Sequence, residues 1–144
     1  MNLPSIQRVL PHRYPFLLVD RVTEFVPGVR IVGVKTFTAN EEASEGHFPG
    51  APMAPTGILI EMVTQLGAIL VLERPEMQGK IAMILHIPSA RMLKPVVPGD
   101  TLRVEAQVVR LRGSFGELRG VAYRGDELVA EGTLRFAITD ASNL

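Results

Sequence analysis

The sequence predicts an α+β domain in which an antiparallel β-sheet wraps around one long central helix. The first observation is size: 144 residues, 47% apolar and 21% charged, suffice for one core, so residues 1–144 should form a single domain. The second is that residues 56–72 are almost entirely apolar, which is typical of a helix covered on every side. The third is that the other apolar runs resemble strands, so a sheet must supply the cover.

The segments before this helix predict a short helix and two strands. The short helix is expected at residues 5–10, and strands at residues 15–25 and 30–38, with a hairpin turn at Pro27-Gly28. Residues 39–54 show little periodicity and are rich in Gly, Pro and Glu. Because this stretch is too long for a simple connection, we expect a functional loop.

The central helix is expected to begin at Pro55, because a first helical turn tolerates proline, and to end near residues 73–75. Its length approaches that of a membrane span. Glu61 lies within it, however, and a carboxylate in lipid is energetically costly. We therefore predict a helix buried in protein and no membrane span.

Four more strands are predicted after the helix, at residues 80–93, 101–112, 115–123 and 127–138. The alternation of apolar and polar residues changes phase at Val108-Val109, which predicts a β-bulge there. The last six residues are expected to form a loose tail.

Composition excludes several classes of function. Fifteen basic and fifteen acidic residues balance, so the chain lacks the basic footprint of a nucleic-acid or membrane-surface protein. There is no cysteine to act as a nucleophile or zinc ligand, and the three histidines are too widely separated to suggest a metal site. No glycine-rich phosphate loop is present, and we expect no cofactor. The first ten residues lack the pattern of a signal peptide, so we expect a cytoplasmic location.

The candidates for chemistry are a histidine and a carboxylate in unusual places. His47 lies in the predicted loop, and Glu61 is the only ionisable residue on the helix before Glu73. Apolar surroundings favour a protonated carboxyl group, which can donate a proton, and Gln65 is one helical turn further on the same face. The free N–H groups at the helix start could hold an oxyanion. A surface histidine and a glutamate paired with an arginine remain the alternative interpretation, and His12 and His86 are interpreted as structural or surface residues.

The sequence resembles the β-hydroxyacyl-acyl-carrier-protein dehydratases of type II fatty acid synthesis over nearly its whole length. The pattern includes LPHRYPFLLVDRV from Leu10, and the helix residues Pro55, Glu61 and Gln65, with a step of fourteen positions from His47 to Glu61. The remaining matching segments are Asn40-Glu41 with GHFPGAP (residues 46–52), Ala90-Arg91 with PVVPGD (residues 95–100), and GDELVAE (residues 125–131).

The resemblance implies the hot-dog fold and a dehydration reaction. A (3R)-3-hydroxyacyl thioester would lose water to give the trans-2-enoyl thioester, with His47 as the base at C2 and Glu61 as the acid at the C3 hydroxyl. It also implies that backbone N–H groups at Phe48 and at Thr56 and Gly57 bind the thioester oxygen, with Gln65 in the same site. The acyl chain would lie in an apolar tunnel beside the helix.

The resemblance further implies partners. A homodimer with a continuous sheet would share its two active sites, His47 coming from one subunit and Glu61 from the other, and could assemble into a hexameric trimer of dimers. The substrate would be held on the phosphopantetheine of an acyl carrier protein. Because that carrier is acidic, a basic patch is expected at the tunnel mouth, and the candidates are Arg91, Lys94, Arg110 and Arg112.

The sequence also departs from the family pattern. Ala43 and Ser44 replace a pair of Phe residues, Thr56 replaces a Gly, Met92 replaces a Phe, and residues 62–64 replace an Ala-rich turn. These changes affect the pocket rather than the acid and base, so a dehydratase for a polyketide or other specialised acyl chain is an open alternative. Two others are a hot-dog thioesterase, which would use a carboxylate and water, and a non-catalytic acyl-binding subunit.

Overall fold

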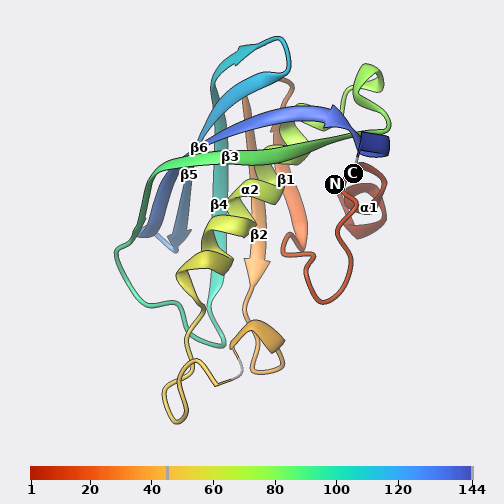
Figure 1. The fold of residues 1–144 in the computed structure, drawn as a ribbon. Coiled ribbons are helices and arrows are strands. Elements are labelled where there is room, and N and C mark those ends of the chain that lie inside the picture. Colours follow the sequence, from red (N-terminus) through yellow and green to blue (C-terminus); the bar gives the residue numbers. More distant parts are fainter. Residues whose placement is uncertain (45, 144) are drawn as a thin grey trace.

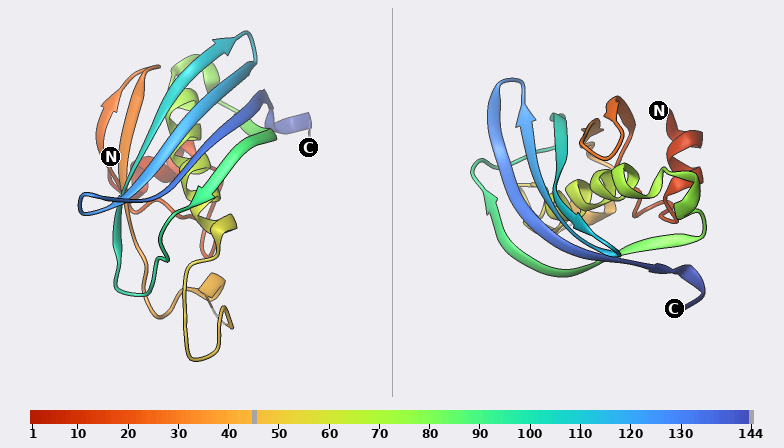
Figure 2. Two further views of the ribbon diagram at one scale, coloured as in Figure 1. Left: turned by 90° about the vertical axis from the view of Figure 1, so that its left-hand side faces the viewer. Right: turned by 90° about the horizontal axis from the view of Figure 1, so that it is seen from above.

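The computed structural model describes residues 1–44 and 46–143, and it contains one six-stranded antiparallel sheet curled around a central helix (Figures 1 and 2). The strands lie in the order β1-β2-β4-β5-β6-β3, so β1 and β3 form the two edges. The principal elements are α1 (Leu3–Val9), β1 (Arg21–Val26), β2 (Arg30–Thr36), α2 (Thr56–Leu72), β3 (Lys80–Met92), β4 (Thr101–Arg112), β5 (Phe115–Arg124) and β6 (Glu127–Asp140). Short 3₁₀ turns cover Glu42–Ser44, Pro75–Met77 and Ala141–Asn143.

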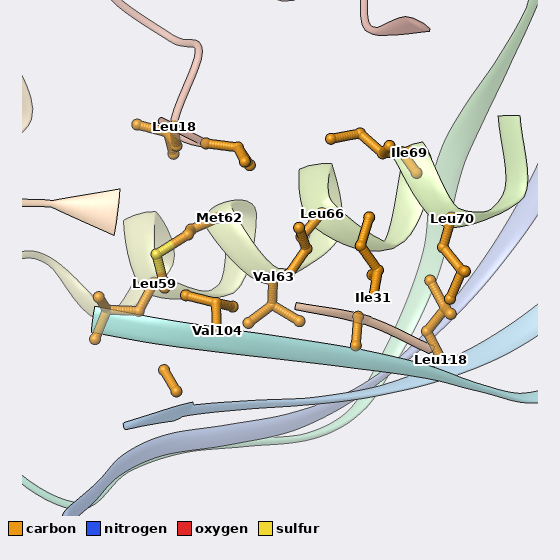
Figure 3. Close-up of a cluster of buried hydrophobic side chains, with 14 of the residues drawn as sticks. Leu18, Ile31, Leu59, Met62, Val63, Leu66, Ile69, Leu70, Val104 and Leu118 are labelled. Atoms are coloured by element: carbon orange, nitrogen blue, oxygen red, sulfur yellow. The ribbon is translucent and has the colours of Figure 1, made fainter. Parts of the chain in front are cut away.

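The core is the contact between α2 and the concave face of the sheet. Val63 and Leu66 of α2 point toward β2, β4 and β5, whereas Leu18 approaches the helix from the other side (Figure 3). The approach is so close that a Cβ atom added at Gly120 of β5 would collide with a methyl carbon of Val63. The prediction of a helix covered on every side is confirmed for residues 65–72, which are all buried, since residues of α1 and of the segment before β1 belong to the same core. Thr56 and Gly57, at the start of α2, are exposed.

Most element boundaries follow the sequence pattern. The hairpin at Gly28 forms with the glycine at a φ of 71°, and the register shift between Val108 and Arg110 confirms the predicted bulge. The helix α2 begins one residue after Pro55, which is its N-cap. No helix in the described ranges is both long enough and apolar enough to cross a membrane.

Three predictions at the ends of the chain need correction. The strand predicted from residue 15 begins only at Arg21, because backbone groups of Phe16 and Leu18 bond to the Gln65 side chain instead of to a neighbouring strand. The first helix spans Leu3–Val9 rather than 5–10, since the side chain of Asn2 caps it. The predicted tail is wrong at residues 139–140, which extend β6 by pairing with β3, and residues 141–143 form a turn; Leu144 lies outside the described residues.

The β3 edge of the sheet is rich in exposed apolar side chains. Met83, Leu85 and Ile87 are 41%, 57% and 39% exposed, and residues 85–91 are exposed throughout. A long apolar edge strand offers free N–H and C=O groups for pairing with another strand.

Candidate active site

The loop that bears His47, residues 39–54, is held by polar contacts at both ends. At its start, the nearly buried Lys35 ammonium lies 2.7 Å from Glu41 Oε1. At its end, the Ala54 N–H donates to the carbonyl oxygen of Val96. The Tyr14 hydroxyl also donates to Glu42 Oε1 at 3.0 Å, and this hydrogen bond to a carboxylate raises the pKa of Tyr14. The loop extends from the sheet at the end where α2 begins (Figure 1).

The His47 ring is oriented by its own loop. Its Nδ1 lies 3.1 Å from the carbonyl oxygen of Met53, and the Met53 N–H donates back to the His47 carbonyl at 2.8 Å. A carbonyl oxygen can only accept a hydrogen bond, so the proton of a neutral His47 resides on Nδ1. Nε2 then carries the lone pair, as a general base requires.

Glu61 lies in the second turn of α2, as predicted, and Gln65 contacts it. Gln65 Nε2 donates to Glu61 Oε1 at 3.0 Å, which confirms the expected i, i+4 hydrogen bond. The Glu61 side chain is 20% exposed, so its surroundings are less apolar than the composition of the helix suggests. Glu61 Oε2 has no hydrogen bond to another described residue.

Gln65 is fully buried, and both the oxygen and the nitrogen of its side-chain amide form hydrogen bonds. Its Oε1 accepts from the Leu18 N–H at 2.8 Å, and its Nε2 donates to the Phe16 carbonyl at 2.7 Å as well as to Glu61. One side chain thus connects the carboxylate to the segment between α1 and β1.

The start of α2 offers free backbone donors. The first helical bonds run from the Ile58 and Leu59 N–H groups to the Pro55 carbonyl, and no side chain of the described residues caps the helix. The N–H groups of Thr56 and Gly57 therefore remain available for an oxyanion. In contrast, the Phe48 N–H already donates to the Ala51 carbonyl at 3.1 Å.

An apolar cleft lies between α2 and the strands β3 and β6, and Arg91 and Glu131, which form an ion pair at 3.0 Å, lie on its wall. Thr56, Leu59, Ile60, Val63, Ser89, Ala130, Gly132 and Leu134 complete the lining. Ser44 lines a separate hollow in the His47 loop, and the Ala43 side chain lies outside what the structure describes.

Within the described part of one chain, no hydrogen bond or ion pair joins His47 to Glu61. The predicted pair is therefore not assembled by direct contact in a single subunit. The four candidate basic residues are also dispersed: Arg91 lies at the apolar cleft and Lys94 follows the end of β3, whereas Arg110 and Arg112 line a different hollow beside Leu85 and Phe115.

Sequence reasoning missed one neighbour of the carboxylate. His12, interpreted as structural or surface, has its Nε2 3.6 Å from Glu61 Oε1. The signal that could have revealed it is the position of His12 within the motif LPHRYP, which matches the family pattern as closely as the loop of His47 does.

Comparisons with known proteins show which family and which proteins the chain resembles. Residues 10–133 match the model of the FabA-like domain family. The chain is 50% identical over 138 residues to the 3-hydroxyacyl-acyl-carrier-protein dehydratase FabZ of Desulforamulus reducens, and the alignment covers 96% of this chain and 97% of that protein.

Solved structures confirm the hot-dog fold. The dehydratase heterocomplex ApeI:P from Xenorhabdus doucetiae superposes with a TM-score of 0.79 at 18% identity, covering 95% of this chain and 92% of that one. A hot-dog-like protein from Thermanaerovibrio acidaminovorans superposes with a TM-score of 0.67 at 20% identity, covering 83% and 87%.

Proposed function

The chain belongs to the FabA-like family and is a 3-hydroxyacyl-acyl-carrier-protein dehydratase, a hydro-lyase, and from this membership we propose that His47 is its catalytic base and Glu61 its acid. The observation that carries this assignment is the hydrogen bonding of the two side chains. His47 is held through Nδ1 and Glu61 through Oε1, which leaves Nε2 and Oε2 without a partner among the described residues.

The base step uses the lone pair on His47 Nε2. It removes a proton from C2 of the 3-hydroxyacyl thioester, and the electrons of the C–H bond move toward the C2–C3 bond. The Nδ1–H group keeps its hydrogen bond to the Met53 carbonyl, so the resulting imidazolium stays oriented.

The acid step uses the proton on Glu61 Oε2. The C3–O bond breaks, the departing hydroxyl takes this proton, and water leaves while C2 and C3 become doubly bonded. The remaining carboxylate shares its charge with Oε1, where the Gln65 amide donates a hydrogen bond. Return of a proton from His47 to Glu61 resets the enzyme.

Negative charge that develops on the thioester oxygen is bound at the start of α2. The Thr56 and Gly57 N–H groups have no helical acceptor, and the helix dipole adds to their effect. The Phe48 N–H can join them only by exchanging its Ala51 acceptor for the substrate oxygen. The acyl chain then extends into the apolar cleft beside α2.

The two catalytic groups meet across a homodimer in this proposal. The apolar edge of β3 supports it, because pairing of two β3 strands would continue the sheet and cover Leu85 and Ile87. Each site would then combine His47 of one subunit with Glu61 of the other. Three such dimers would give the hexamer.

We assign the substrate to the phosphopantetheine arm of an acyl carrier protein. We also assign the reaction to fatty acid biosynthesis and the protein to the cytoplasm. Arg91 at the cleft wall is the best placed of the candidate docking residues, although it pairs with Glu131. Reversing its charge in Arg91→Glu should raise the KM for carrier-bound substrate and leave that for small thioesters unchanged; equal effects on both would remove Arg91 from the proposal.

The reaction is tested by following enoyl absorbance and free thiol together, with 3-hydroxyacyl and enoyl thioesters. We expect interconversion without thiol release in the wild-type protein, and loss of at least about 100-fold in kcat in His47→Ala and Glu61→Gln. Thiol release would indicate a thioesterase. Wild-type turnover in either variant would show that the assigned acid–base pair is wrong.

Sharing of the site between subunits is tested by mixing the same two variants. If the pair forms across subunits, random mixing restores about a quarter of wild-type activity, because about half of the dimers are mixed and each has one intact site. If both groups come from one chain, the mixture stays inactive.

A further inference from the structure

The fold brings the His12 side chain next to the Glu61 carboxylate, a contact that the spacing of the two residues in the sequence does not predict. It lies between α1 and β1, far from α2 in the chain, yet its Nε2 is 3.6 Å from Glu61 Oε1. Among the residues that the structure describes, no Lys or Arg side chain lies within ion-pair distance of Glu61. His12 is therefore the one basic group that contacts the carboxylate in the described chain.

The other nitrogen of the ring helps to fix where its proton lies. His12 Nδ1 is buried and has no hydrogen-bond partner among the described residues, so neither tautomer gains a bond to them at that atom. A proton on Nε2 would face the Glu61 oxygen, whereas a lone pair there would repel it. The neutral ring therefore presents an Nε2–H donor to Glu61 Oε1.

The backbone around His12 is held tightly. The Arg13 guanidinium donates to the carbonyl oxygens of Leu10, His12 and Gln7 at 2.8, 2.7 and 2.9 Å. The centroid of the Phe16 ring lies 6.2 Å from that of the His12 imidazole. The Phe16 carbonyl accepts a hydrogen bond from Gln65, which also donates one to Glu61. The same buried amide thus holds both Glu61 and the backbone at Phe16, four residues after His12.

We propose that His12 is a positioning residue for Glu61, an inference that rests on the proposed role of Glu61 as the acid. Two donors, Gln65 Nε2 and His12 Nε2, face the same oxygen, Oε1, and leave the proton on Oε2. In the chain without substrate, the 3.6 Å between His12 Nε2 and Glu61 Oε1 is longer than a hydrogen bond. It shortens when substrate closes the site and Glu61 develops negative charge.

The test compares two substitutions of almost equal length, His12→Gln and His12→Met. Glutamine keeps an N–H donor near the position of Nε2, and methionine does not. We expect His12→Met to lower kcat by about 10- to 100-fold with little change in KM, as for a displaced catalytic group, and His12→Gln to recover most of that loss. Urea unfolding of both variants controls for stability.

Three outcomes separate this proposal from the one on which it rests. Wild-type kcat in His12→Met, with Glu61→Gln inactive, would overturn the role of His12 alone. Equal losses in both His12 variants, in proportion to lost stability, would likewise reduce His12 to a structural residue. An active Glu61→Gln variant would instead remove the acid itself, whatever the His12 variants do.

Discussion

The Thr56 hydroxyl lies 3.9 Å from the sulfur of Met92, so two positions at which this chain departs from its family pattern contact each other. Thr56 begins α2 and Met92 ends β3. Thr56 also lines the apolar cleft. The contact between the helix and the strand thus involves a residue of the cleft wall, Thr56, near the proposed thioester position.

We expect Thr56→Gly to widen this part of the cleft and to favour bulkier acyl chains. The free N–H at position 56 remains, so turnover of the best short substrate should persist. The ratio of kcat/KM for long over short 3-hydroxyacyl thioesters should rise by about 10-fold, the effect of one or two methylene groups in a pocket. An unchanged ratio across chain lengths would mean that Thr56 does not set specificity.

Gln65 should be required for both stability and activity. Gln65→Leu leaves the Leu18 N–H and the Phe16 carbonyl without partners, and we expect about 2–4 kcal/mol less unfolding free energy in urea titrations. Gln65→Glu keeps an acceptor for the Leu18 N–H but removes the donors to the Phe16 carbonyl and to Glu61, and it buries a second carboxyl beside Glu61, so both kcat and the unfolding free energy should fall. Thr64→Ala is the control on the same helix; it loses only a bond to the Ile60 carbonyl and should cost less than about 1 kcal/mol.

The Lys35–Glu41 ion pair should hold the start of the loop that bears His47. Glu41→Gln leaves the Lys35 ammonium buried, with Asp20 the remaining carboxylate at 4.0 Å, and should lower the unfolding free energy by about 2–3 kcal/mol. The double variant Lys35→Met/Glu41→Gln should be more stable than Glu41→Gln, because no uncompensated charge remains. The single variant Lys35→Met completes the comparison. If the losses of unfolding free energy in Lys35→Met and Glu41→Gln add up to the loss in the double variant, the ion pair contributes no coupling energy.

Glu117 should make stability depend on pH in the acid range. The hydrogen bond from the Arg135 guanidinium to Glu117 Oε2, at 2.8 Å, lowers the pKa of Glu117 from its ordinary value of 4.5. Because the folded pKa is below the unfolded one, the contribution is complete above the unfolded value and is lost as pH falls through the folded value. The stability difference between wild type and Glu117→Gln should therefore be present at pH 7 and vanish in strong acid. A difference that is constant across this range would contradict the assignment.

Local patterns in the sequence were enough for most of the architecture. The largely apolar α2 requires a sheet to cover it, and the alternation in β4 together with its phase change at Val108 located a strand and its bulge. The Glu61–Gln65 contact could also be predicted, because residues four apart on a helix necessarily face the same side. The start of β1 could not: residues 15–20 have strand composition, but Gln65, far along the chain, binds their backbone.

The sequence by itself determined the elements, the hot-dog architecture and the pair of residues proposed for acid–base chemistry, since helix and strand periods act over a few residues and short motifs preserve their spacing. Only the tertiary structure decided that His12 faces Glu61, that Thr56 contacts Met92, and that the Phe48 N–H is engaged within its own loop. The first two contacts join segments that lie tens of residues apart in the chain, and the third is set by hydrogen bonding within the loop itself. The first two arrangements follow from packing of the whole core around α2, which no local pattern specifies.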